Sequence, residues 1–353
     1  MKDERVLAIR EGWKFAGNDY LGLASHASVL EALGVAAAKY GISSTSSRWA
    51  QGWTQVHADL EQALADWMGT EDACIIGAAY FGGVIYYEQM AALGRQVVFC
   101  DEMVHANQYL GMRAAGLDVR KFRHLDAGSL REMVTGYSGP PAIVATDGVY
   151  GISGEVAPLA ELAEIARGIG AEFFVDDAHG VGVMGAHGRG AAEFAGLSPD
   201  TATVLGSMSK AMGTGGGFLA GRGELVERFR RSTAASGSGC PPPPIAGASL
   251  SAVHIIRNDP EPRRLMEANA DRMRAALAAK GIALVNDTHP IVCMQLSDEH
   301  EAVALDRHFE ANGISIPYFK YASEPRQNLL RAAARAVYTD EQLARFEKAV
   351  REF

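Results

Sequence analysis

The 353-residue sequence predicts an α/β protein with a mostly parallel sheet in a large domain and a smaller α+β domain at the C-terminal end. Short apolar runs alternate with helical patterns as far as residue 217. Polar residues directly follow several of these runs, where open α/β sheets bind ligands. A Ser-, Gly- and Pro-rich stretch at 236–244 then marks a hinge. We therefore expect an N-terminal arm (1–30), a large domain (31–240) and a small domain (241–353).

The composition is that of an ordinary globular protein, with 48% hydrophobic and 21% charged residues. A net charge of −9 without a block of Lys or Arg argues against binding to nucleic acid or to an anionic membrane. The four cysteines form no CxxC pair, so neither a disulfide framework nor a zinc site is indicated. No run of eighteen apolar residues or signal-type start occurs, and we expect a soluble, cytoplasmic protein.

The N-terminal third predicts a helix at about 28–40 and a second helix that ends near residue 67. A buried strand at 73–76 follows and passes through small residues into another helix. Unpaired amides and the helix dipole both attract an anion at such a turn. The backbone amides of Ala79 and Tyr80 are therefore candidates for binding a phosphate.

Two more buried strands are predicted at 96–100 and 142–146, and each is followed by polar residues. The first leads into a segment that contains His105, and the second leads into 147–154. A helical pattern at 159–167 continues the alternation of strands and helices.

The stretch from residue 172 to residue 217 holds the densest set of reactive side chains. An apolar run at 172–175 ends in an Asp and a nearby His, and a second run at 203–206 ends in two serines and a lysine. Glycines at 213–217 allow backbone to approach a ligand closely. A lysine amine beside phosphate-binding hydroxyls can form a Schiff base with an aldehyde cofactor. The side chains expected to share one pocket are Asp176, His179, Ser207, Ser209 and Lys210.

Beyond the hinge the pattern alternates again, which predicts the smaller α+β domain. Helices are expected near 265–280, 301–312 and 339–350, and strands near 291–296 and 329–334. Arg331 lies in the second of these strands, among apolar neighbours.

Three motifs carry a resemblance to a known family: Asn-Asp-Tyr-Leu-Gly-Leu at 18–23, Val-Asp-Asp-Ala-His-Gly-Val-Gly at 175–182 and Gly-Ser-Met-Ser-Lys-Ala at 206–211. They resemble the pyridoxal-phosphate (PLP) enzymes of the aspartate aminotransferase fold, fold type I, and most closely the α-oxoamine synthases. The resemblance covers nearly the whole chain. It implies a PLP-dependent acyltransferase that condenses an amino acid with an acyl thioester, carried by CoA or a carrier protein, and gives an α-amino ketone with loss of CO2. It also implies a homodimer with the active site at the interface.

The same resemblance implies a role for each catalytic residue. Lys210 would bond to the cofactor and serve as acid and base. Asp176 would keep the pyridine nitrogen protonated, because a nearby opposite charge favours the charged form. His179 would sit beside the ring hydroxyl, and His105 would stack on the ring face.

Other residues are expected to bind the phosphate and the substrate. The phosphate would be bound by Ala79, Tyr80, Ser207, Ser209 and, from the neighbouring subunit, Ser238. Arg331 would clamp the substrate carboxylate, for which a planar guanidinium is suited. Asn18 and Ser323 would add substrate contacts.

The chain departs from the family pattern at Ala78, Gly83, Gly151 and Tyr338, and the arm before the first motif is short. Gly151 replaces a serine that ordinarily lies at the cofactor's edge. These departures favour a specialised biosynthetic pathway. The alternative is other PLP-dependent carbon–carbon bond formation without CoA, or γ-elimination or replacement on an amino acid such as S-adenosylmethionine.

Rival interpretations of single motifs have less support. Residues 180–185 fit the dinucleotide pattern G-x-G-x-x-G, but Asp-Asp-Ala-His separates them from the strand. A metal site built from Asp176, Asp177, His179 and His187 has no usual ligand spacing and leaves the lysine unexplained. A scaffold that has lost catalysis is disfavoured because the lysine, the Asp and both histidines are present. His57 is interpreted as structural.

Overall fold

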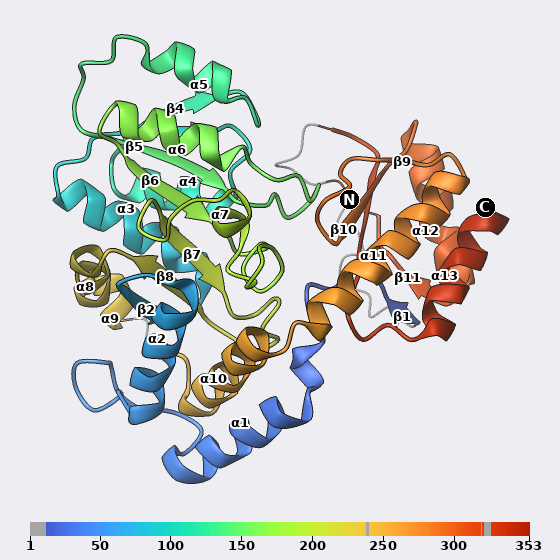
Figure 1. Ribbon diagram of the computed structural model, residues 1–353, viewed down its shortest axis with the longest axis horizontal. Coiled ribbons are helices and arrows are strands. Elements are labelled where there is room, and N and C mark those ends of the chain that lie inside the picture. Colours follow the sequence, from blue (N-terminus) through green and yellow to red (C-terminus); the bar gives the residue numbers. More distant parts are fainter. Residues whose placement is uncertain (1–11, 238–239, 319, 321–325) are drawn as a thin grey trace, which may run out of the picture. The chain divides into compact units, whose positions relative to one another are not determined.

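The computed structural model describes residues 12–237, 240–318, 320 and 326–353 (Figure 1). The described chain falls into two compact units. The larger unit comprises Leu21–Tyr150 and Val156–Arg263, and the smaller unit comprises the segment up to Tyr20, Gly151–Glu155 and Arg264–Phe353. A division into domains at residues 30 and 240 stays a prediction.

The larger unit is built on a seven-stranded sheet, in which the neighbouring strands run in the order β2-β8-β7-β6-β5-β3-β4. All neighbouring pairs from β7 to β4 are parallel, whereas β8 is antiparallel to both β2 and β7. The strands are β2 (Asp72–Ile76), β3 (Val97–Asp101), β4 (Asp118–Phe122), β5 (Ala142–Asp147), β6 (Glu172–Asp176), β7 (Thr203–Ser207) and β8 (Gly217–Gly221). The expected α/β fold with a mostly parallel sheet is confirmed.

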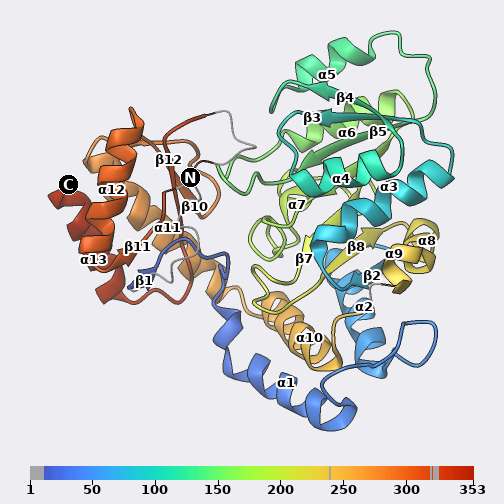
Figure 2. The same cartoon turned by 180° about the vertical axis from the view of Figure 1, so that it is seen from behind.

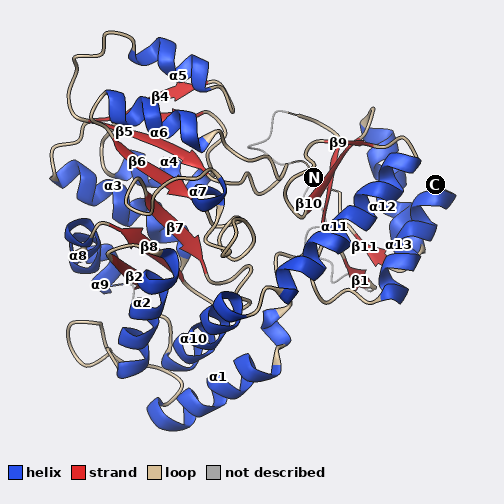
Figure 3. Cartoon of the chain, in the orientation of Figure 1, coloured by secondary structure: helices blue, strands red, loops and turns tan. Residues whose placement is uncertain are grey.

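Helices cover both faces of this sheet (Figures 1 and 3). Helix α6 lies in front of the sheet in Figure 1, and α3 and α4 lie in front of it in the reverse view of Figure 2. The helices are α1 (Ala27–Tyr40), α2 (Gln55–Met68), α3 (Gly82–Ala92), α4 (Ala106–Ala114), α5 (Ala127–Val134), α6 (Leu159–Gly168), α7 (Ala191–Phe194), α8 (Gly223–Arg231), α9 (Thr233–Gly237) and α10 (Pro243–Asn258), with 3-10 turns η2 (Leu23–Ser25) and η3 (Ala79–Phe81).

The central strands are buried along their whole length, which explains their unbroken apolar runs. Every residue of β3, β5, β7 and β8 is buried. Strands with helices on both faces do not alternate between apolar and polar residues. The apolar runs in the sequence therefore marked the buried strands β3, β5 and β7. The polar residues lie at the ends of the strands.

The smaller unit has its own sheets and its own core. In one sheet β10 (Ile291–Gln295) lies between β9 (Ala283–Leu284) and β12 (Leu329–Ala333), and in the other β1 (Trp13–Lys14) pairs in parallel with β11 (Ile314–Ser315). Its helices are α11 (Glu261–Ala279), α12 (Glu299–Ala311) and α13 (Asp340–Glu352). The expected helices and strands of the C-terminal region are confirmed, and the N-terminal segment joins them through β1.

Helices α3 and α4 pack backbone to backbone through two glycines. A Cβ atom on Gly111 of α4 would lie 2.6 Å from the carbonyl carbon and oxygen of Gly83 in α3. A Cβ on Gly83 would lie 3.1 Å from the carbonyl oxygen of Asn107. The absence of side chains at both positions therefore sets the distance between the helices.

Replacing Gly111 by Ala should destabilise the protein by about 1–3 kcal/mol, because the added methyl group meets backbone that cannot rotate away. Gly34 in α1 is the matched control, since a Cβ there meets no atom within 4 Å. Gly34→Ala should instead stabilise by about 0.4–1 kcal/mol. Urea unfolding of both variants measures this, and equal midpoints for the two would contradict the packing described.

Candidate active site

Segments that follow five strands meet at one edge of the large sheet. Strands β2 and β7 are both antiparallel to β8 and are therefore parallel to each other. Gly217 of β8 pairs with the last residue of each, Ile76 and Ser207. Asp147 and Asp176 end β5 and β6 and are paired in register. The predicted groups are thus collected at the carboxyl edge, where open α/β sheets bind ligands.

The segment after β2 supplies unpaired amide donors at a helix start. Ala79 and Tyr80 open η3, which runs directly into α3, and the first N–H groups of a helix lack partners within it. Gly217 makes close contact possible here, because a Cβ on it would lie 2.5 Å from the Cα of Ala79. The hydroxyls of Ser207, which is buried, and Ser209, which is exposed, lie 3.0 Å apart. Amides, hydroxyls and the helix dipole form a donor set suited to a phosphate.

Asp176 provides a buried carboxylate at the end of β6. The carboxylate accepts hydrogen bonds from the Asn107 side-chain amide at 3.1 Å and from the Ala178 backbone N–H at 3.3 Å. His105 stands at the N-cap of α4, and its Nδ1 lies 2.8 Å from the Asn107 side-chain oxygen. The ring of Tyr80 meets the His105 imidazole edge-on, with centroids 6.3 Å apart. His105 and Asp176 are therefore connected through one side chain.

A second buried carboxylate, Asp147, holds the backbone of His105 in place. Asp147 was not among the predicted site residues. It accepts the backbone N–H of His105 at 3.2 Å and the side-chain amide of Gln108 at 2.6 Å. Burial, together with the charge of Asp176, raises the pKa of Asp147 well above its ordinary value. Burial beside a second carboxylate therefore favours the protonated form of Asp147. The acid at the end of the apolar run 142–146 was the only signal for it in the sequence.

Asp177, the residue after Asp176, fastens the turn that follows β6. Its carboxylate accepts the N–H of Ala191 at 2.7 Å. Cβ atoms on Gly148, Gly180 or Gly190 would collide with its oxygens at 1.9–2.4 Å. Burial raises the pKa of Asp177 to about 7. Gly180 thus allows a turn around a buried carboxylate, and no helix directly follows β6 as a dinucleotide site requires.

Lys210 and His179 lie in the turns that follow β7 and β6, and both are half-buried. Ser238 and Ser323, predicted to contact phosphate and substrate, lie outside the described residues. Among the residues that the structure describes, no group of three His, Cys, Asp or Glu side chains is arranged to hold a metal ion.

In the smaller unit, Arg331 is buried within a cluster of acceptors. Its Nε donates to the carbonyl of Gly151 at 2.7 Å, and Nη1 donates to the carbonyl of Ala16 at 3.1 Å. Its Nη2 donates to the side-chain oxygen of Asn18 at 2.7 Å and to the hydroxyl of Tyr20 at 3.3 Å. Burial raises the pKa of Tyr20 to about 12, so its hydroxyl stays protonated. Two of the three residues expected to bind substrate, Asn18 and Arg331, are brought together.

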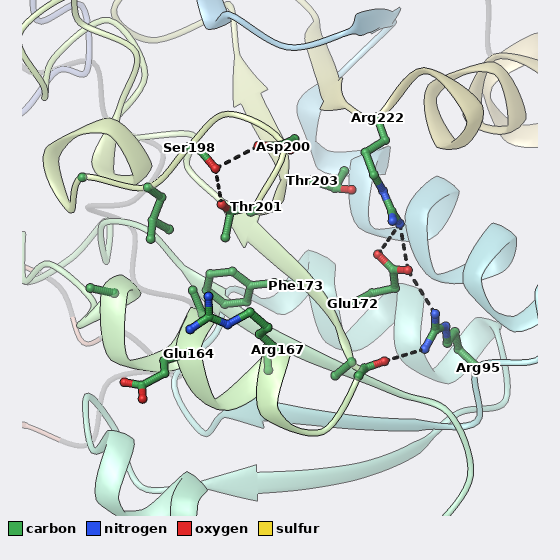
Figure 4. A pocket seen from close by; sticks show the side chains of 18 residues that line it. Arg95, Glu164, Arg167, Glu172, Phe173, Ser198, Asp200, Thr201, Thr203 and Arg222 are labelled. Carbon is green, nitrogen blue, oxygen red and sulfur yellow. Dashed lines mark hydrogen bonds and ion pairs between the residues drawn. The ribbon is translucent and has the colours of Figure 1, made fainter.

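An open cavity of the larger unit lies away from these groups, at the opposite ends of the strands (Figure 4). It measures about 610 Å³ and is lined by the first residues of β6 and β7, Glu172 and Thr203. Glu172 pairs with Arg95 at 3.0 Å and with Arg222 at 2.7 Å. Glu172 and the two arginines are thus paired with one another, and none of the predicted reactive side chains lines this cavity.

The side chains at the carboxyl edge fit PLP. Amides and hydroxyls are present for its phosphate, a buried carboxylate for its protonated ring nitrogen, an exposed imidazole for its face and a lysine for its aldehyde. Gly217 keeps the phosphate side open, where any side chain would fill the space beside Ala79.

Comparisons with known proteins agree with this fit. The family model for aminotransferase class I and II matches residues 10–350. An 8-amino-7-oxononanoate synthase of Methylococcus capsulatus is 32% identical over 332 residues, which cover 93% of this chain and 86% of the relative. Serine palmitoyltransferase of Sphingomonas wittichii superposes with a TM-score of 0.89 at 27% identity, covering 97% of this chain and 88% of that one. The serine palmitoyltransferase of S. paucimobilis, solved with a bound PLP–myriocin aldimine, has a TM-score of 0.90 with the same identity and coverage.

No helix in the described part of the chain is both long enough and apolar enough to cross a membrane.

His57 in α2 holds two loops of the larger unit together. Its Nε2 lies 2.8 Å from the carbonyl of Pro241, which can only accept, so Nε2 carries the proton. Its Nδ1 therefore accepts from the N–H of Thr54 at 3.1 Å and from the Thr54 hydroxyl at 2.9 Å. Burial lowers the pKa of His57, although the bond to Pro241 opposes this. The neutral ring links the start of α2 to the segment before α10.

Acidification should therefore destabilise the protein in part through His57. In the unfolded chain this ring titrates near about pH 6.5, and in the folded protein its pKa is lower. As the pH falls below the unfolded value, the unfolded chain binds a proton that the folded protein does not, so stability is lost until the folded pKa is reached. Urea unfolding from about pH 8 to about pH 5 should show a steeper loss for wild type than for His57→Gln, which cannot titrate. Parallel curves for the two proteins would contradict this role.

Proposed function

From the premise that this chain belongs to the aminotransferase class I and II family, and within it to the α-oxoamine synthases, we propose that it joins an amino acid to an acyl thioester. In the overall reaction the α-carbon of the amino acid bonds to the acyl carbon. The bond to the amino-acid carboxylate breaks to release CO2, and the C–S bond breaks to release the thiol, which takes up one proton. The product is an α-amino ketone. The observation that carries the proposal is the buried carboxylate of Asp176 on β6 next to the strand that ends in Ser207 and leads to Lys210.

Bound PLP supplies an electron sink for the amino-acid carbon. Asp176 would hold the ring nitrogen positive, His105 would lie against the ring, and His179 would lie beside its hydroxyl. The phosphate would be bound by the amides of Ala79 and Tyr80, the hydroxyls of Ser207 and Ser209 and, from a second subunit, Ser238.

Lys210 is the residue proposed to move protons at the reacting carbon. A primary amine held beside that carbon can take the α-proton and return it after the bond has formed. His105 is the second proton carrier, because its imidazole is exposed at the edge where the ligand binds. Burying both groups around the ligand would exclude water from the thioester and limit its hydrolysis.

Arg331 is proposed to bind the substrate carboxylate with Asn18. Hydrogen bonds between them already place both side chains at one point of the smaller unit. A guanidinium has five N–H groups, and bonds from Arg331 to Gly151 and Ala16 fix its plane while Nη2 points to Asn18. Ser323 is proposed as a further substrate contact.

We also propose a cytoplasmic homodimer with its active site at the interface. In support, large apolar side chains are exposed along residues 30–49, including Val35 at 63%, Ile42 at 82% and Trp49 at 54%. Large apolar side chains left exposed in one segment support a subunit contact there. Sedimentation velocity measures the oligomeric state directly.

The function is tested by following thiol release from an acyl-CoA and from an acyl-carrier thioester, each with a panel of amino acids. Release should require a matching amino acid and should be accompanied by one CO2 per thiol. Lys210→Ala should reduce the rate by at least about 10²-fold, whereas Lys121→Ala, on the edge strand β4, should leave it unchanged. Borohydride should attach the cofactor to Lys210 in the wild type. Thiol release that ignores the amino acid, or cofactor chemistry that proceeds equally without thioester, would rule the condensation out.

Replacing Arg331 by Lys should raise KM for the amino acid by about 10- to 100-fold, because an ammonium cannot replace a planar fork and a hydrogen bond to a charged group contributes about 1.5–3 kcal/mol. The control is Arg345→Lys, an exposed arginine of the same unit that bonds only to the carbonyl of Asn312 among the contacts described. Equal KM values for both variants would exclude the clamp. Thermal unfolding of both variants separates this effect from lost stability.

A further inference from the structure

Asn107 connects two side chains that act at the carboxyl edge. Its amide nitrogen lies 3.1 Å from the Asp176 carboxylate, and its amide oxygen lies 2.8 Å from Nδ1 of His105. Asn107 is only 3% exposed, so water does not take the place of either partner. The amide spans the space between the two side chains.

The charge of Asp176 decides which way the amide of Asn107 points. An ionised carboxylate can only accept hydrogen bonds, whereas an amide has an acceptor at one end and donors at the other. Turning the amide over would place its oxygen 3.1 Å from a carboxylate oxygen, which is repulsive. The NH2 group therefore faces Asp176, and the oxygen faces His105.

The orientation of Asn107 in turn decides which nitrogen of His105 carries the proton. The contact between the amide oxygen and Nδ1 measures 2.8 Å, which two acceptors would not tolerate, so Nδ1 must donate. The backbone N–H of Asn107 also approaches Nδ1, at 3.3 Å. That contact is the longer one, and it is not a hydrogen bond once Nδ1 is protonated.

We propose that Asn107 is a positioning residue that fixes neutral His105 as the Nδ1–H tautomer, with Nε2 left as a proton acceptor. The amide transmits the charge of Asp176 to the imidazole without any contact between the two. Asp147 touches only the backbone N–H of His105 and does not reach the ring nitrogens in the contacts described.

The tautomer limits what His105 can do in the reaction. A neutral ring with its lone pair on Nε2 can take a proton from a ligand, and it can give one only after Nε2 has been protonated. His105 therefore acts first as a base and then as an acid toward the acyl oxygen. This consequence rests on the proposed function, whereas the tautomer itself does not.

The tautomer can be read by long-range nitrogen–proton NMR of the full-length chain labelled with 15N-histidine, before and after removal of bound cofactor. The chain has ten histidines, and the signals of residue 105 are assigned by their loss in His105→Gln. In the wild type without cofactor, Nδ1 should give the shift of a protonated nitrogen and Nε2 that of an unprotonated one.

Two variants test whether Asp176 sets the tautomer of His105 through Asn107. In Asn107→Ala the pattern should move toward Nε2–H, and in Asp176→Asn it should become mixed, although residue 176 does not touch the ring. Glu172→Gln, at the other end of the same strand, is the control and should keep the wild-type pattern. An Nε2–H pattern in the wild type, or one unchanged in both variants, overturns the proposal. Because no turnover is measured, failure here is distinct from failure of the thiol-release assay.

Discussion

The structure depends on the hydrogen bonds that hold the buried carboxylate at the end of β6. A buried carboxylate is costly unless it is hydrogen-bonded, and Asp176 meets this condition through the Asn107 amide and the Ala178 N–H. Burial and the neighbouring Asp176 raise the pKa of Asp147. The Asp176 carboxylate also orders Asn107 and, through it, His105.

Close packing between helix backbones places Asn107 and His105 at the site. Gly83 and Gly111 let α3 approach α4, which carries Asn107 in its first turn and His105 at its N-cap. Gly83 departs from the family pattern. The structure gives a packing reason for the departure, because a Cβ at this position would meet the carbonyl of Asn107. Gly217 works in the same way at the phosphate side, where it admits Ala79.

The smaller unit gathers segments from three parts of the chain around Arg331. Its guanidinium binds the carbonyls of Ala16 and Gly151 and the side chain of Asn18, from segments more than 130 residues apart. At Gly151 the contact uses a backbone carbonyl, so the serine expected from the family pattern is not needed to hold the arginine. The side chain that we propose for substrate recognition therefore also joins these segments.

The sequence by itself determined five of the seven strands of the large sheet, the order of the reactive residues and the family, because buried parallel strands appear as unbroken apolar runs and Asp176, His179 and Lys210 lie in local motifs. It did not indicate β4 or β8. Tertiary structure alone decided that Asp147 and Gln108 support His105, that Asn107 bridges it to Asp176, and that β1 pairs with β11. These contacts join residues on different elements, and neither periodicity nor spacing along a chain encodes the distance between them. The raised pKa of Asp147 likewise depends on burial beside Asp176, which exists only after the strands have paired.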